Sequence, residues 1–171
     1  KFITNRLRAL KLEVRTRVGG HGVVGVLRGN KANPTVAYRA DMDALPLQEK
    51  LDQPYRSLHL GVSHACGHDA HIAIALGTAE RLAAQRKELP GTIKFIFQPA
   101  EESLDGAQAM IEDGVLTSPC PHALLAQHVF PIPAGSLGLT TDACLAGMEE
   151  FRVRFYAPAG NLEAIQEAAI T

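Results

Sequence analysis

The stretch TIKFIFQPAEE, residues 92–102, decides the fold class of this chain. Its first six residues form a nearly continuous apolar run, which is typical of a β-strand that is covered on both faces. The run ends at Gln98-Pro99-Ala100, and two adjacent carboxylates, Glu101 and Glu102, follow directly. A strand that is buried on both faces needs a layer above and below it, so this segment predicts the centre of an α/β sheet.

The segments on either side of this strand alternate between helical and extended patterns. Apolar residues recur at helical spacing in residues 1–12 and again from Asp69 to Ala83, before Pro90-Gly91 ends the second pattern. A further helix is expected at 105–112, and strands are expected at 14–18, 23–27, 35–39 and 123–127, the last of them buried. We therefore predict an α/β fold with a mostly parallel central sheet flanked by helices.

The character of the sequence changes after Gly147. Apolar and polar residues alternate over 151–156, which predicts a half-exposed strand, and residues 161–169 have a helical pattern. We expect residues 1–148 to form one domain, and residues 149–171 to begin a second domain or to be a remnant of it.

Composition and charge exclude several classes of function. The 171 residues are 46% hydrophobic and 20% charged with a net charge of −1, which is ordinary for a globular protein. There is no basic stripe, so we expect neither nucleic acid nor an anionic membrane as a partner. Apolar runs such as 123–126 are far too short to span a bilayer. The three scattered cysteines, Cys66, Cys120 and Cys144, favour a reducing compartment, and we expect the cytoplasm.

Residues that bind metals or transfer protons gather where the predicted strands end. The carboxyl ends of strands in an α/β sheet meet at one edge, where functional groups collect. Three separate strands that end in such residues therefore predict a functional site at that edge. The clusters are Asp41-Met42-Asp43, His64 to Asp69, Glu101-Glu102, and His128.

The cluster His64 to Asp69 indicates metal binding. Cys66 and His68 stand just before a predicted helix, where the helix N-terminus and a bound metal would both stabilise a thiolate. A lone cysteine here would be interpreted as a buried turn residue, but the neighbouring His64, His68 and Asp69 favour a ligand. His64 and His71, taken singly, are interpreted as structural or supporting residues.

The remaining clusters each allow two interpretations. Glu101 and Glu102 point in different directions from a strand end, so one can bind metal while the other handles protons; the alternative is a solvated acidic turn. His128 alone would be a core histidine, although the other clusters favour a ligand. Asp43 could orient a ligand histidine, or Arg39 could form a structural ion pair with one of the two aspartates.

Four strings in this sequence resemble a known group of enzymes. They are RADMDALP (39–46), SHACGHDAH (63–71), FQPAEE (97–102) and QHVFP (127–131). The strings are similar to those of the amidohydrolases typified by hippurate hydrolase and indole-acetyl-amino-acid hydrolase, within the aminoacylase and carboxypeptidase group of dinuclear metallopeptidases. The resemblance covers residues 1–156 and implies a dinuclear zinc-peptidase-like catalytic domain.

The resemblance also implies a mechanism. Cys66, His68, Glu102 and His128 would bind two divalent cations, with Cys66 as the bridge. Zinc suits these donors, and manganese or cobalt are alternatives. Glu101 would be the general base that takes a proton from the attacking water. Asp43, which could orient a ligand histidine, is the second candidate catalytic residue. The expected reaction is hydrolysis of the amide bond of N-acyl amino acids or small peptide conjugates.

The family pattern contains parts that have no match here. The family has a further histidine ligand near the end of a much longer chain, and a lid histidine where this sequence reads Tyr156 to Asn161. A segment upstream of residue 1 also has no match. The resemblance thus implies a domain truncated at both ends, inactive on its own, whose lid would support a homodimer.

Two other hypotheses stay open at this point. In the first, Cys66 is a nucleophile and His68 or His128 is its base, although residues only two apart rarely form such a hydrogen bond. In the second, the chain is a catalytically incompetent fragment or homologue that serves as a binding or structural domain.

Overall fold

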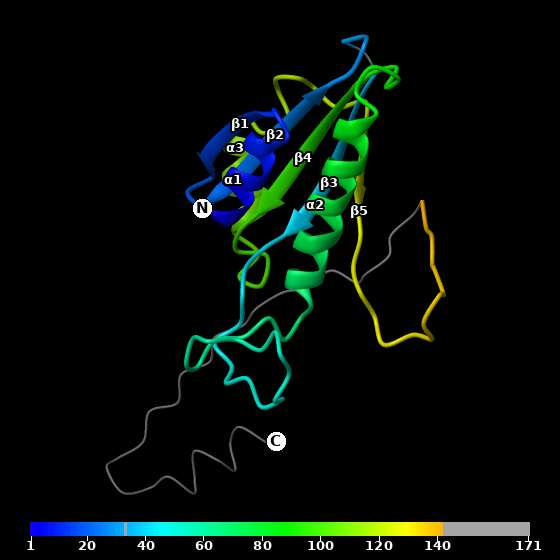
Figure 1. The fold of residues 1–171 in the computed structure, drawn as a ribbon. Coiled ribbons are helices and arrows are strands. Elements are labelled where there is room, and N and C mark those ends of the chain that lie inside the picture. The colour runs from blue at the N-terminus through cyan, green and yellow to red at the C-terminus, as the bar shows by residue number, and fades with distance from the viewer. Residues whose placement is uncertain (33, 142–171) are drawn as a thin grey trace, which may run out of the picture. The chain divides into compact units, whose positions relative to one another are not determined.

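The computed structural model describes residues 1–32 and 34–141 of the chain (Figure 1). Residues Lys1–Pro131 form one compact unit. The expected α/β alternation is confirmed, while the expected boundary near residue 148 and the elements beyond it lie outside the described residues. The elements are α1 (Phe2–Ala9), β1 (Glu13–Val18), β2 (Gly22–Arg28), β3 (Thr35–Asp41), α2 (His68–Ala84), β4 (Thr92–Gln98), α3 (Gly106–Glu112) and β5 (Ala123–Ala126).

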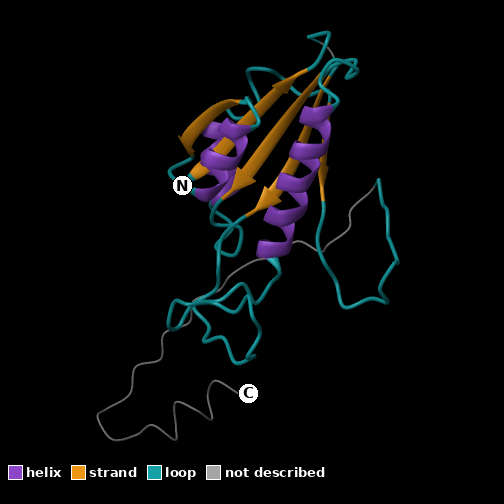
Figure 2. Cartoon of the chain, in the orientation of Figure 1, coloured by secondary structure: helices purple, strands orange, loops and turns teal. Residues whose placement is uncertain are grey.

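The five described strands form one mixed sheet in the order β1-β2-β4-β3-β5 (Figure 2). β3 runs parallel to both β4 and β5, whereas β2 runs antiparallel to both of its neighbours. Four of the described strands therefore point the same way, as predicted, and β2 is reversed. The reversal follows from the tight turn between β1 and β2, where Gly20 adopts a φ of 87° that a side chain would disfavour.

Two apolar layers cover the sheet, one on each face. α1 and α2 pack on one face, and α3 packs on the other (Figure 2). β4 contributes to both layers, because successive side chains of a strand point to opposite faces. Phe95 and Phe97 belong to the first layer and Ile96 to the second. The expectation that this strand is covered on both faces is confirmed.

Within the described part of the chain, the strand at 123–127 is not buried, contrary to expectation. Leu124 is 49% exposed and Leu125 is 58% exposed. β5 is the edge strand of the sheet that the described residues form, bonded to β3 on one side, and neither apolar layer of these residues includes any part of it. Apolar composition shows that a strand is suited to burial, but burial also requires a layer that packs on it.

The fold brings several chain segments to one edge of the sheet. β3, β4 and β5 are parallel, so their carboxyl ends coincide, and α2 begins at the same edge with His68. The long connection from β3 to α2 is tied together by a β-bridge between Leu45 and Ser63. No helix in the described part of the chain is long and apolar enough to cross a membrane.

Candidate metal centre

The four predicted metal ligands come together at the carboxyl edge of the sheet. Cys66 Sγ lies 3.4 Å from His128 Nε2. His68 Nε2 lies 3.8 Å from Glu102 Oε1 and 3.7 Å from Glu101 Oε2. The donor atoms of Cys66, His68 and His128 lie within 4.8 Å of one another, as do those of His68, Glu101 and Glu102. His68 therefore joins two overlapping groups of donors.

The orientation of His68 leaves one ring nitrogen without a partner. Its Nδ1 lies 3.0 Å from the backbone oxygen of Asp43, and since a carbonyl can only accept, Nδ1 carries the proton. Nε2 is then a lone-pair acceptor, and in the described residues it is buried with no hydrogen-bond partner. It faces the carboxylates of Glu101, Glu102 and Asp41, the last at 3.8 Å. An arrangement of lone pairs and negative charges without a donor is suited to a cation.

Asp43 connects this histidine to the end of β4. Its Oδ2 accepts the backbone N–H of Glu102, and its Oδ1 lies 3.3 Å from Nδ1 of His68. Burial acts to raise the pKa of Asp43, but the backbone N–H groups of Glu102 and Glu101, together with His68, outweigh it and hold this pKa below its ordinary value. Asp43 is therefore ionised at neutral pH, as a carboxylate that orients a histidine needs to be.

Cys66 is a thiol when no cation is near. Burial raises the pKa of the Cys66 thiol, and the carboxylates of Glu102, Glu101 and Asp41 raise it further. A metal ion bound at the thiol would reverse this effect, because a coordinating thiol loses its proton. The state of Cys66 thus depends on whether positive charge is present among the donors.

The structure decides which aspartate pairs with Arg39. Arg39 Nη1 lies 2.7 Å from Oδ2 of Asp41, whose side chain is fully buried, so the ion pair uses Asp41 and leaves Asp43 for His68. The other oxygen of Asp41 accepts a hydrogen bond from His71. The hydrogen bond between His71 and Asp41 was not predicted from the sequence. The spacing of His68 and His71, one helical turn apart, is the signal that places both rings on the same face of α2.

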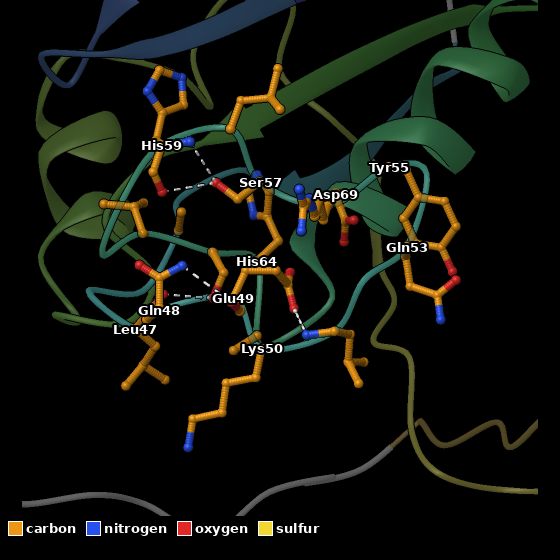
Figure 3. Close-up of a pocket in the computed structure, with 17 residues that line it drawn as sticks. Leu47, Gln48, Glu49, Lys50, Gln53, Tyr55, Ser57, His59, His64 and Asp69 are labelled. Atoms are coloured by element: carbon orange, nitrogen blue, oxygen red, sulfur yellow. Dashed lines mark hydrogen bonds between the residues drawn. The ribbon is translucent and has the colours of Figure 1, made fainter.

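A hollow of about 960 Å³ lies beside the donors, within the connection that leads from β3 to α2 (Figure 3). Apolar side chains such as Leu47 and Tyr55 line it, together with His64 from the connection before α2 and Asp69 from the first turn of α2. None of the four predicted ligands lines this hollow. It adjoins the donor cluster and does not contain it.

The sequence of residues 37–169 matches the model of peptidase family M20/M25/M40. The chain belongs to this family. The resemblance noted in the sequence is thereby confirmed, and the donor cluster of this M20-family chain lies within the matched residues.

Relatives of known activity and structure support the assignment to the M20 family. The chain is 37% identical to hippurate hydrolase of Campylobacter jejuni over 169 residues, which is 98% of this chain and 44% of the relative. It is 40% identical to N-acetylcysteine deacetylase of Bacillus subtilis over 141 residues, covering 82% and 37% of the two chains. The crystal structure of the Bacillus subtilis YXEP protein, a dinuclear metal binding peptidase of the M20 family, matches with a TM-score of 0.71 and 41% identity over 76% of this chain and 36% of that one. This chain thus spans well under half the length of these relatives.

Proposed function

We propose that the complete protein is a metal-dependent amidohydrolase that binds two divalent cations at the carboxyl edge of the sheet. The observation that carries this proposal is the buried Nε2 of His68, which has no hydrogen-bond partner among residues 1–32 and 34–141 and faces three carboxylates. A buried acceptor without a hydrogen bond, surrounded by negative charge, costs free energy in the folded state. A bound cation would supply the positive charge that this arrangement lacks.

The ligands in this proposal are Cys66, His68, Glu102 and His128. Thiolate, imidazole and carboxylate donors together favour zinc, with manganese or cobalt as alternatives. Asp43 holds His68 with its proton on Nδ1, so that Nε2 stays free to bind. A count of two ions is supported by the dinuclear metal-binding peptidase of Bacillus subtilis, which shares the fold and 41% of the aligned sequence.

Glu101 acts as the general base in the proposed reaction. When bound, the cations lower the pKa of water and polarise the amide carbonyl. The Glu101 carboxylate is 31% exposed, so a substrate and a water molecule can reach it. It takes a proton from the attacking water and passes that proton to the leaving amine. The choice of Glu101 and not Glu102 as the base follows the resemblance noted in the sequence, because the two side chains are similarly exposed, at 31% and 28%.

The proposed substrates are N-acyl amino acids or small peptide conjugates. The relatives at 37% and 40% identity are a hippurate hydrolase and an N-acetylcysteine deacetylase, and both of these names denote an N-acyl amino acid as the substrate. We extend this substrate class to the present protein, because the matched residues include the whole donor cluster.

One observation favours a second candidate, in which Cys66 is a nucleophile. The distance of 3.4 Å between Cys66 Sγ and His128 Nε2 is compatible with a nucleophile and its base. However, a nucleophilic cysteine needs a lowered pKa, and the pKa of Cys66 is raised. Among the described residues, His128 Nδ1 also contacts the carbonyl of Val129 and no Asn or Asp side chain that would orient it.

Metal removal from the full-length protein separates these candidates. The protein is treated with a chelator, dialysed, and assayed on a panel of N-acyl amino acids before and after zinc, manganese or cobalt is added back. We expect hydrolysis to disappear with the metal and to return with one of the three ions. Activity that survives complete metal removal but is abolished by alkylation of Cys66 would instead establish the nucleophile. A metal-loaded protein without activity on the panel would contradict the proposed substrates.

A further inference from the structure

Both ring nitrogens of His71 are engaged within the protein. Nε2 lies 2.9 Å from the backbone nitrogen of Val129, whose N–H can only donate, so Nε2 is the acceptor. Nδ1 therefore carries the proton and donates it to Oδ1 of Asp41. Asp41, His68 and His71 stand close enough together to form a metal site. In this arrangement, however, both ring nitrogens of His71 are bonded to other protein groups, so no lone pair is left for a cation.

Val129 links His71 to the donor cluster through its backbone. Its carbonyl oxygen lies 2.7 Å from Nδ1 of His128, so this nitrogen carries the proton. Nε2 of His128 therefore has a free lone pair, and it is the nitrogen that lies near Cys66. The side chain of Val129 packs on Gly67, where an added Cβ would lie 2.4 Å from Cγ2 of Val129. The N–H, the carbonyl and the side chain of Val129 thus each contact a different part of the site.

His71 connects this residue to β3 and β4, two interior strands of the described sheet. Asp41, the last residue of β3, is fully buried and pairs with Arg39 at 2.7 Å. Arg39 in turn donates from Nε to the side chain of Gln98, the last residue of β4, at 2.8 Å. By contrast, Val129 follows β5, the exposed edge strand. Among the described residues, the bond to His71 is the hydrogen bond that anchors the backbone of 128–131 to another element.

We propose that His71 is a positioning residue that fixes the peptide of Val129 and thereby aims Nε2 of His128 at a cation shared with Cys66. This inference rests on the proposed function, because it assumes that His128 is a ligand. The ring of His71 also packs edge-on against His128, with centroids 4.8 Å apart and planes at 70°, which restricts rotation of the ligand ring. A ligand that is not held in place binds more weakly, and loss of such a supporting partner typically lowers metal affinity about 10- to 100-fold.

Two substitutions of His71 in the full-length protein each retain one of its two hydrogen bonds and remove the other. His71→Asn places an amide N–H near the position of Nδ1, so it retains the bond to Asp41 but is too short to reach Val129. His71→Gln places an amide oxygen near the position of Nε2, so it retains an acceptor for Val129 but loses the bond to Asp41. We expect His71→Asn to weaken zinc binding about 10- to 100-fold and His71→Gln to bind zinc nearly as tightly as the unaltered protein.

Zinc affinity is measured by competition with a chromophoric chelator, and the thermal midpoint of the metal-free protein is measured in parallel. The visible spectrum of the cobalt-loaded protein reports the ligand geometry, and His71→Asn should shift it in the same direction as His128→Ala does. If His71 only supports the fold, both variants lower the thermal midpoint and leave zinc affinity and the cobalt spectrum unchanged. That outcome, or equal zinc affinities in the two variants, overturns the inference.

His122 offers a matched control. Its Nδ1 accepts the backbone N–H of Thr35 at 3.1 Å, which is the same kind of bond at the opposite end of β3 from Asp41. His122→Phe removes that bond and should leave zinc affinity unchanged; a loss as large as that of His71→Asn would overturn the specific role of His71. Failure of the unaltered protein to bind zinc, manganese or cobalt would contradict the proposed function itself. An unaltered affinity in His71→Asn contradicts only this inference.

Discussion

Nε2 of His128 lies 3.4 Å from Sγ of Cys66, although 62 residues separate them in the sequence. Cys66 leads into α2, whereas His128 follows β5, and the two elements are brought together through β3, which pairs with β5 and packs against α2. The two donors are therefore adjacent only after the sheet has formed. Metal binding and folding of this part of the chain should accordingly be linked.

Removal of the Cys66 thiol should abolish the stabilisation by zinc. A ligand that binds only the folded state at 100 times its dissociation constant stabilises that state by about 2.7 kcal/mol. We expect zinc to raise the thermal midpoint of the unaltered protein and to raise that of Cys66→Ala much less. Cys120, which is exposed and is not part of the cluster, provides the control: Cys120→Ala should respond like the unaltered protein. Equal responses of all three proteins would exclude Cys66 as a ligand.

The two adjacent glutamates should respond differently to the same substitution. Glu101→Gln should reduce turnover by about 10²- to 10⁴-fold, as expected for loss of a general base, while metal content stays nearly unchanged. Glu102→Gln should lower the metal content itself, because an amide is a weaker ligand than a carboxylate. Elemental analysis and turnover are measured on the same preparations. If both variants lose metal equally, the division of roles between base and ligand is wrong.

Zinc binding should release a proton from Cys66 at neutral pH. Burial and the carboxylates of Glu102, Glu101 and Asp41 raise the pKa of this thiol, so the metal-free native protein stays protonated there. Zinc binds the thiolate, and zinc affinity should therefore rise with pH. Calorimetric titration in buffers of different ionisation enthalpy counts the protons released. Cys66→Ser should release about one proton fewer, and an unchanged count would contradict thiolate binding.

The raised pKa of Cys66 also predicts how the free energy of unfolding of the metal-free protein changes with pH. The thiol of the unfolded chain ionises near its ordinary pKa of about 8.5, below the raised pKa of Cys66 in the native state. Above a pH of about 8.5, the native state therefore binds more protons than the unfolded state. The free energy of unfolding of the metal-free protein should fall in this range. Urea unfolding across this pH range measures the fall, which should be smaller in Cys66→Ala; equal falls would contradict the shift.

Gly67 should tolerate a side chain less well than another glycine of similar conformation. Gly67 and Gly20 have φ values of 81° and 87°, so alanine at either position carries a conformational cost of about 1–2 kcal/mol. An added Cβ at Gly67 would also lie 2.4 Å from Val129, whereas nothing lies within 4 Å at Gly20. Gly67→Ala should therefore lose more stability in urea unfolding than Gly20→Ala, and it should also weaken zinc binding. Equal losses would mean that the contact with Val129 relaxes at no cost.

Local patterns in the sequence determined the elements of the fold and the edge at which the site lies. The apolar run at 92–97 predicted the central strand, and β4 is buried on both faces. The clusters that follow β3, β4 and β5 met because parallel strands end at the same edge of a sheet, whatever side chains they carry. These features depend on periodicity and on strand direction, both of which can be inferred from neighbouring residues.

Contacts between distant residues were decided by the tertiary structure alone. The sequence left open whether Arg39 pairs with Asp41 or with Asp43, and it did not indicate the bonds from His71 to Asp41 and Val129. The sequence also predicted that β5 is buried, whereas its apolar residues are exposed in the described part of the chain. Periodicity identifies the apolar face of an element, but the partner of that face depends on the order of strands and on which layer packs there. Hydrogen bonds across 30 or 58 residues depend further on side-chain directions, which only the packed sheet and helices determine.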